Sequence, residues 1–321
     1  MGRYLLRRLG FALVLVFVVS SAALLLTRLA PGDFAAMQGV DLSAEQREQL
    51  REELGLNQSF TAQYLEWLGG AARFDFGRSL LYSRPVSELI GERALNTAVL
   101  AIAALLLATI IGIPLGVYSG THTGLRKAIV RGISTIGLSV PPLIGSLALV
   151  FIAARTGWFP VGGMTSASGI DMTWAQWIAD LLRHLPMPAL ALAIPLAATL
   201  ERLQSESIES SMRERFVAAS RARGVDRARS ILRHAWPVSL RPVLGLYGLM
   251  IGSLFSGSFA VEVVTSWPGL GRLMFDALKA RDLFLVAGCA ATGAVFLAAG
   301  TLIADLILAW TDPRTVSGDR A

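Results

Sequence analysis

The chain has 321 residues, of which 54% are hydrophobic and 16% are charged, and its mean hydropathy is +0.56. A soluble domain of this length cannot bury so much apolar surface, so the composition excludes one and indicates a membrane protein. The net charge of +6 does not indicate nucleic-acid binding, because the basic residues are spread over short segments between apolar runs. Cys289, the one cysteine, lies in such a run, so an intrachain disulfide is excluded.

Six apolar runs are long enough to cross a hydrocarbon core about 30 Å thick, which predicts six transmembrane helices in an all-α protein. They cover residues 9–29, 94–119, 132–154, 186–205, 240–261 and 283–309. The first run follows Arg7 and Arg8, an arrangement also typical of a secretory signal with Ser20-Ser21-Ala22 as its cleavage site. Because the run continues through Leu26, we expect an uncleaved span.

The distribution of basic residues predicts the orientation of the chain. With the N-terminus inside, seventeen of the twenty-nine lysines and arginines lie in cytoplasmic segments, nine of them between Arg202 and Arg241. The outer segments hold twelve, of which seven lie in the long 28–93 segment beside ten acidic residues. We therefore expect both termini, including a tail at 313–321, in the cytoplasm.

Residues 1–93 are expected to form the first span and an extracytoplasmic helical segment. Ser43 followed by Gln46 is typical of a capping box, Gly55 is a helix stop, and a second helix is predicted over Phe60 to Leu68. A surface for an extracytoplasmic partner and a plain cap over the helices both fit this segment.

Residues 94–312 are expected to form a core of five spans, several of which contain prolines that bend helices. Pro114 lies in the second span, Pro141 and Pro142 in the third, and Pro195 in the fourth. Proline removes a backbone donor, and broken membrane helices are tolerated where protein or a water-filled cavity satisfies the freed carbonyls. A translocation path and ordinary helix kinking both remain open.

The cytoplasmic loop at 206–239 has the pattern of two short helices bent at a glycine. The segment from Arg213 to Arg223 is predicted to form one helix with small side chains, and Gly224 is predicted to end it in the left-handed conformation. Asp226 is predicted to cap the next helix, and Pro237 is expected to mark the start of the following span. The loop fits either a plug for an acidic partner or a solvated basic segment.

The outer connection from Val263 to Asp282 contains Trp267-Pro-Gly-Leu-Gly-Arg272. Its proline and glycines are expected to interrupt any helix, and tryptophan is typical of the membrane edge.

No pattern indicates an energy source within the chain. Asp305 is the clearest ionisable candidate within a span, and no phosphate-binding loop, metal-binding helix or nucleophile elbow is present. The three histidines lie in different loops, so we expect no metal and no cofactor. If the protein moves a solute uphill, another subunit must supply the energy.

Several separated motifs resemble, in order, the integral membrane permeases of binding-protein-dependent ABC importers of the dipeptide, oligopeptide and nickel type. They are Arg3-Tyr4-Leu5-Leu6-Arg7-Arg8, Ala30-Pro31-Gly32-Asp33, Leu54-Gly55-Leu56, Gln63-Tyr64-Leu65-Glu66-Trp67-Leu68, Asp75-Phe76-Gly77-Arg78-Ser79, Ala222-Arg223-Gly224, Val261-Glu262-Val263-Val264, Trp267-Pro268-Gly269-Leu270-Gly271-Arg272-Leu273, Ala280-Arg281-Asp282 and Asp312-Pro313-Arg314. Together they cover nearly the whole chain.

The resemblance implies a type I ABC importer permease fold in the bacterial plasma (inner) membrane, with the chain forming half of a path for peptides or a related small solute. It also implies a second homologous permease, two cytoplasmic ABC ATPase subunits or domains, and an extracytoplasmic solute-binding protein, with no catalysis in this chain. The loop that contacts the ATPase would include Phe216, Ala219, Ser220, Arg221, Arg223, Gly224, Ile231 and Pro237. The path or its gate would include Pro141, Pro142, Glu262, Trp267, Gly269 and Gly271.

One position departs from the general pattern of such loops, which begin with a glutamate before two alanines. This chain has Val217 there, and Glu214 lies three residues too early. An ion-coupled secondary carrier, a membrane enzyme and a non-transporting membrane scaffold are the alternative functions, and the transported solute stays open.

Overall fold

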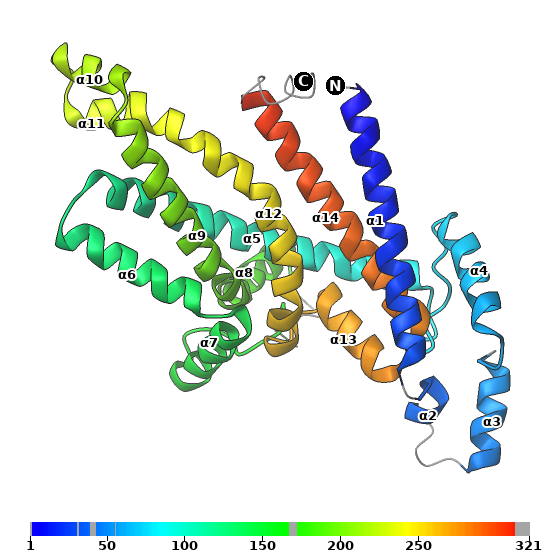
Figure 1. Ribbon diagram of the computed structural model, residues 1–321. Coiled ribbons are helices and arrows are strands. Elements are labelled where there is room, and N and C mark those ends of the chain that lie inside the picture. Colours follow the sequence, from blue (N-terminus) through cyan, green and yellow to red (C-terminus); the bar gives the residue numbers. More distant parts are fainter. Residues whose placement is uncertain (1, 31, 39–42, 55, 167–171, 312–321) are drawn as a thin grey trace. The chain divides into compact units, whose positions relative to one another are not determined.

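A computed structural model of the chain describes residues 2–30, 32–38, 43–54, 56–166 and 172–311 (Figure 1). These residues form helices and connecting turns, with one isolated bridge between Arg78 and Pro85 in the described part. The prediction of an all-α protein is confirmed, whereas the predicted tail at 313–321 lies outside the described residues. The chain divides into two compact units, residues 1–98 with 268–298 and residues 99–267 with 299–321.

The predicted spans fall on four long helices and two bent pairs of helices. The long helices are α1 (Gly2–Leu29), α5 (Val86–Thr121), α12 (Trp236–Val264) and α14 (Leu283–Thr311). The pairs are α6 (Leu125–Ser139) with α7 (Pro142–Thr156) and α8 (Trp174–His184) with α9 (Pro186–Met212). In the described part, four helices are long and apolar enough to cross a membrane alone, and the number is six if each pair is one crossing.

The third predicted span, 132–154, is broken at its two prolines, as the sequence indicates. Its two helices meet at 101°, with Val140 in extended geometry and Pro141 preceding the first residue of α7. Pro142 has no amide hydrogen to continue α6, and a proline disfavours helical geometry in the residue before it, so the break falls here. Pro114 and Pro195 lie inside continuous helices and interrupt neither α5 nor α9.

In the first unit, three short helices follow α1: α2 (Phe34–Gln38), α3 (Ala44–Glu53) and α4 (Phe60–Ala71). The predicted capping box of Ser43 and Gln46 is confirmed, and α4 ends three residues later than predicted. The predicted stop at Gly55 lies outside the described residues. Leu24, Trp67 and Ala287 form a buried cluster that packs α1, α4 and the start of α14 together.

The connection after α12 contains a helix that the sequence pattern did not predict. Helix α13 (Leu270–Ala280) begins directly after Gly269, and Gly271 lies in its first turn without interrupting it. The expectation that these glycines break any helix is therefore wrong for Gly271. Leu270, Leu273 and Ala277 are buried on one face of α13, and this burial stabilises the helix.

Asp282 ties two distant segments of the first unit together. Its buried carboxylate accepts hydrogen bonds from the Ser79 hydroxyl at 2.6 Å, the Leu81 amide at 3.0 Å and the Leu285 amide at 3.2 Å. The last of these caps the start of α14, so one carboxylate holds the 79–82 turn against a helix end.

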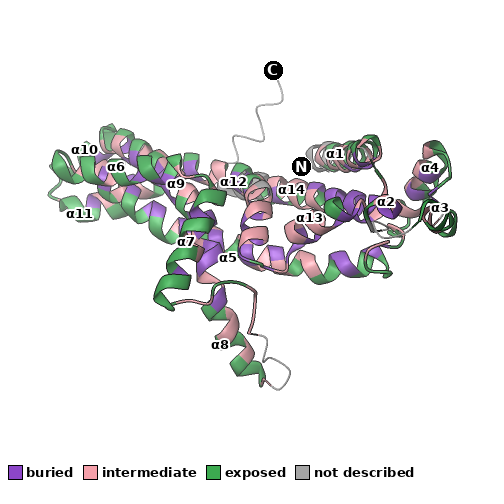
Figure 2. Cartoon of the chain, turned by 90° about the horizontal axis from the view of Figure 1, so that it is seen from below, coloured by how far each residue is buried: buried purple, intermediate pink, exposed green. Residues whose placement is uncertain are grey.

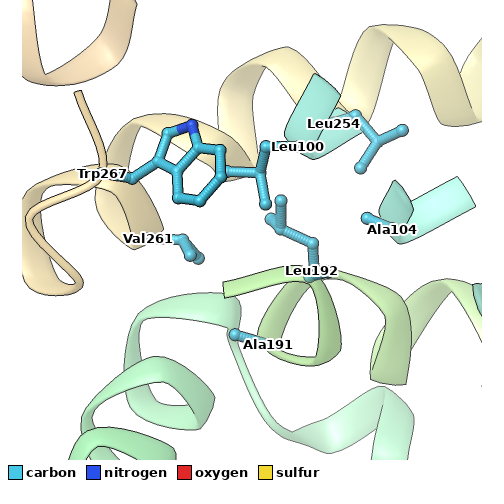
Figure 3. Close-up of a cluster of buried hydrophobic side chains, with 8 residues drawn as sticks. Leu100, Ala104, Ala191, Leu192, Leu254, Val261 and Trp267 are labelled. Carbon is cyan, nitrogen blue, oxygen red and sulfur yellow. The ribbon is translucent and has the colours of Figure 1, made fainter. Parts of the chain in front are cut away.

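The second unit has its core between α5, α9 and α12 (Figure 3). Leu100, Leu192, Leu254 and Trp267 meet there, and the Trp267 side chain is fully buried. Its ring packs beside Leu100 of α5, Leu192 of α9 and Val261 of α12 (Figure 3).

Three glycines spaced four residues apart let α5 approach α9 closely. A Cβ added at Gly112 would lie 2.5 Å from the Ala197 carbonyl oxygen, one at Gly116 2.6 Å from Gln204 Cβ, and one at Gly120 2.4 Å from the Ser205 carbonyl oxygen. Small residues at this spacing are typical of close helix packing in membranes. The two helices therefore form one tightly packed pair over these residues.

Large apolar side chains cover the outer faces of α6 and α7, where Figure 2 shows mostly exposed residues. Ile129, Ile133, Ile136 and Phe151 are each more than half exposed. A face of this kind is suited to lipid or to another membrane subunit.

Candidate functional site

Two short helices join α9 to α12 at one end of the second unit (Figure 1). They are α10 (Arg215–Ala222) and α11 (Arg227–Ser230), and a π-helical turn over Ile231–Ala235 leads into α12. The predicted pair of helices bent at a glycine is confirmed. Helix α10 starts two residues later than predicted, because Arg213 caps α9 and Glu214 is extended.

Gly224 ends α10 in the left-handed conformation that the sequence predicts, with φ of +81°. The Gly224 amide donates to the Arg221 carbonyl at 3.0 Å, and the Val225 amide donates to the Ser220 carbonyl at 3.3 Å. These two bonds form a Schellman motif, which satisfies carbonyls that a helix end leaves free. The bend between α10 and α11 is therefore built into the backbone at Gly224.

The other two predicted helix signals are confirmed. Asp226 caps α11, since its carboxylate accepts a hydrogen bond from the Ala228 amide at 3.0 Å. Pro237 lies in the first turn of α12, which continues the helical segment that starts at Arg227.

A small apolar cluster anchors α10 to the ends of the long helices. Val217 is fully buried and packs with Ile208 of α9 and Ala235, with Ile231 at the edge of the cluster. Val217 stands where the resemblance leads us to expect a glutamate, so this position anchors the helix instead of presenting a charge. Ser220, three residues on, is 1% exposed, and its hydroxyl has no partner among the described residues.

The opposite face of residues 215–235 is exposed and partly apolar. Phe216 is 41% exposed, Leu232 is 57% exposed, and Ala219 is exposed as well. Exposed apolar groups on a small-residue helix allow another backbone to approach, and no described segment of this chain covers them. We call residues 215–235 the elbow from here on.

The elbow carries a concentrated positive charge. Arg221, Arg223 and Arg229 are exposed, and within the described ranges no acidic side chain pairs with them. Arg227 instead donates to the Thr121 carbonyl at the end of α5, at 2.6 Å. The free guanidinium groups make this face suitable for an acidic partner.

An ion pair joins the first turn of α6 to the last turn of α9, beside the elbow. The Lys127 ammonium lies 2.5 Å from Glu209, and Arg213 lies 2.9 Å from the same carboxylate. The two segments that the basic-residue rule assigns to the cytoplasm therefore lie at the same end of the second unit.

A buried polar cluster, absent from the sequence-based prediction, lies between α5, α9 and α12 next to the elbow. The Ser119 hydroxyl donates to the Glu201 carboxylate, and Gln204 donates to the Ser239 hydroxyl at 2.8 Å. All four side chains are buried. Glu201, Gln204 and Ser205 at positions i, i+3 and i+4 of an apolar helix are the signal that indicates such a cluster.

The six predicted path residues belong to several elements of the fold. Pro141 and Pro142 lie at the bend between α6 and α7, and a Cβ added at Gly257 of α12 would lie 3.7 Å from Pro142. Glu262 is buried near the end of α12, Trp267 lies in the core, and Gly269 precedes α13. In the described part of the chain, no three histidine, cysteine or acidic side chains are grouped as metal ligands.

Two family models match the chain. The model described as the inner membrane component of binding-protein-dependent transport systems matches residues 112–317, and the model of the N-terminal part of such membrane components matches residues 1–101. The oligopeptide transport system permease protein AppB of Bacillus subtilis is 34% identical over 98% of this chain and 99% of its own length. A probable peptide ABC transporter permease of Sinorhizobium fredii is 31% identical over the same shares.

A solved structure of the MetNI methionine ABC transporter in an inward-facing conformation is similar in fold. One of its chains has a TM-score of 0.50 and 16% identity, covering 70% of this chain and 96% of that chain.

Proposed function

Because the chain belongs to the family of inner membrane components of binding-protein-dependent transport systems, we propose that it forms half of an ATP-driven path for peptides. It is a permease subunit in the bacterial inner membrane with several membrane-spanning helices, and its family works with an ATPase and a solute-binding protein. Peptides are proposed as the solute because the two relatives described above are named for oligopeptide and peptide transport.

The exposed elbow carries this proposal most directly. Its bend is built into the backbone at Gly224, its inner face is anchored by Val217, and its outer face presents Phe216, Leu232 and unpaired arginines. An exposed apolar patch ringed by charge is typical of a protein interface. We infer that this face receives the cytoplasmic ATPase, with Arg221 and Arg223 toward acidic groups of that partner.

The packing behind the elbow explains how force applied there reaches the membrane. Helices α9 and α12 continue directly from the elbow, the glycines at 112, 116 and 120 lock α5 against α9, and the buried Ser119–Glu201 bond joins the same two helices. A tightly packed group of helices moves as a body. Closure of the ATPases would therefore rock α5, α9 and α12 together and open the path toward alternate sides.

A second permease subunit would cover part of the exposed apolar surface. We propose a similar but distinct chain as this partner, with two ATPase subunits or domains on the cytoplasmic side and both termini of this chain in the cytoplasm. The exposed isoleucines of α6 support a membrane-embedded neighbour, lipid or protein.

One observation favours a different function, an ion-coupled secondary carrier. Glu201 is 1% exposed within a helix of a candidate span, and ionisable groups in such places are usually functional. Its bond to Ser119 and its position beside the elbow also suit a structural role, which the importer proposal assigns to it.

Photo-crosslinking tests where the ATPase binds. A benzophenone amino acid in place of Ala219, on the exposed face of the elbow, is expected to crosslink to the ATPase in the assembled complex. The same group in place of Leu106, which is 57% exposed in the middle of α5, is the matched control and is expected to give no ATPase adduct. Equal crosslinking from both positions, or none from Ala219, would contradict the proposal.

A further inference from the structure

A pocket of about 340 Å³ lies wholly within the first unit, between the turn after Ser79, the start of α5, and α13. Its lining consists of Tyr82, Arg93, Pro268, Arg272, Leu273 and Asp276. Some of these residues belong to the motifs that carry the family resemblance, but none of them lies in the elbow proposed to contact the ATPase.

Arg93 faces this pocket with part of its guanidinium unsatisfied. Its Nε is buried and has no hydrogen-bond partner among the described residues. Glu88 and Glu92, in the first two turns of α5, form ion pairs with Arg84, at 3.2 Å and 2.6 Å. A buried guanidinium nitrogen without an acceptor is costly, so the site is suited to an incoming anion.

Asp276 supplies the opposite charge on another wall of the same pocket. No basic side chain pairs with it in the part of the chain that the structure describes, so Arg93 and Asp276 do not neutralise each other. Tyr82 adds a phenol whose pKa is raised by burial, which keeps it protonated and able to donate a hydrogen bond.

We propose that this pocket binds a small zwitterion, namely an amino acid or a dipeptide. Its carboxylate would lie toward Arg93, Tyr82 and Arg272, and its ammonium toward Asp276. The volume is near the lower limit of ordinary ligand pockets, about 300 Å³, so it fits one or two residues and not an extended oligopeptide. In the orientation proposed above, this is a site on the outer side of the membrane, so its role as a solute site rests on that proposal.

Saturation-transfer NMR on the assembled transporter in lipid nanodiscs tests this pocket, with the binding protein omitted so that it contributes no peptide affinity. The probes are alanyl-alanine, its N-acetyl form and its C-terminal amide, each up to about 10 mM because millimolar affinity is detectable. Alanyl-alanine is expected to bind, and each blocked form to bind about tenfold more weakly, because each has lost one charged contact.

Variants locate the contact. Arg93→Gln and Asp276→Asn are expected to weaken alanyl-alanine binding about tenfold, and Arg93→Lys less than Arg93→Gln. Lys279→Gln is the matched control, since this exposed residue lies on α13 outside the pocket. The blocked-peptide comparison uses the unaltered protein, so it holds even if a variant folds poorly.

Three results would overturn the inference: no signal from alanyl-alanine, equal binding of a blocked form, or unchanged binding in a folded Arg93→Gln variant. ATP-driven peptide uptake by the complete transporter separates this inference from the proposed function. Peptide uptake without pocket binding would support the proposed function and contradict the inference about the pocket. Pocket binding without any peptide uptake would support the inference about the pocket and contradict the proposed function.

Discussion

Replacing Gly224 with valine tests whether the bend of the elbow is needed for coupling. Gly224 has φ of +81°, and a Cβ added there meets no atom within 4 Å. The free-energy cost of the substitution therefore comes from the backbone alone. A residue other than glycine costs about 1–2 kcal/mol in the left-handed region, and a β-branched residue costs more. Since 1.4 kcal/mol is about a tenfold change, the population with the bent elbow should fall by about tenfold.

The assay is peptide uptake and binding-protein-stimulated ATP hydrolysis by the reconstituted transporter. Gly224→Val is expected to reduce both about tenfold, whereas Gly224→Asn should retain most activity because asparagine tolerates left-handed geometry. Gly157→Val is the matched control, because Gly157 has φ of +67°, also caps a helix and also has no atom within 4 Å. Normal coupling in Gly224→Val, or an equal loss in Gly157→Val, would refute the reasoning.

Three further predictions concern the elbow, the packing behind it and the first unit. Changing both Arg221 and Arg223 to glutamate should weaken co-purification of the ATPase, most clearly at low salt, and a complex that survives high salt with both changes would identify these arginines as solvated charges. Gly116→Ala should destabilise the protein by about 1–3 kcal/mol, because the added Cβ would lie 2.6 Å from Gln204 Cβ and 2.7 Å from the Glu201 carbonyl oxygen. Thermal unfolding in detergent measures this loss. The control Gly132→Ala should show no loss, because a Cβ added at Gly132 meets no atom within 4 Å. Asp282→Ala should also lower the unfolding temperature, because the Ser79 hydroxyl and the Leu81 and Leu285 amides lose a shared acceptor at about 1–3 kcal/mol per buried group left unsatisfied, and an unchanged unfolding temperature would contradict that assignment.

Features decided by a few neighbouring residues were predictable from the sequence. The left-handed Gly224, the Asp226 cap, the capping box at Ser43 and the break at Pro141 all depend on local backbone chemistry. The approximate positions of the spans were predictable for a similar reason, since the length of an apolar run decides whether it can cross a bilayer.

Features decided by contacts between distant segments were not predictable. The burial of Trp267 depends on side chains from α5, α9 and α12, and the bonds of Asp282 reach back about 200 residues to the Ser79 turn. The 101° angle between α6 and α7 also depends on packing, although the break itself is local. Helix α13 is an intermediate case, because Leu270, Leu273 and Ala277 have helical spacing that the neighbouring glycines and proline obscured.

Within the elbow, the sequence predicted the bend but not which face is free. The alternation between buried Val217 and Ser220 and exposed Phe216 and Ala219 follows from how α10 docks on α9 and α12. The buried polar cluster around Glu201 likewise needed the three-dimensional arrangement, because its partners come from three helices.

Peptide accumulation in sealed vesicles tests the central claim, that this chain moves solute only through work supplied by a partner ATPase at its elbow. Vesicles with both permease subunits, the ATPases, ATP inside and the binding protein outside are expected to accumulate a radiolabelled peptide. Vesicles without the ATPases are expected to accumulate none, with or without a proton or sodium gradient. Accumulation driven by an ion gradient in vesicles that contain this chain alone would contradict the account and identify a secondary carrier.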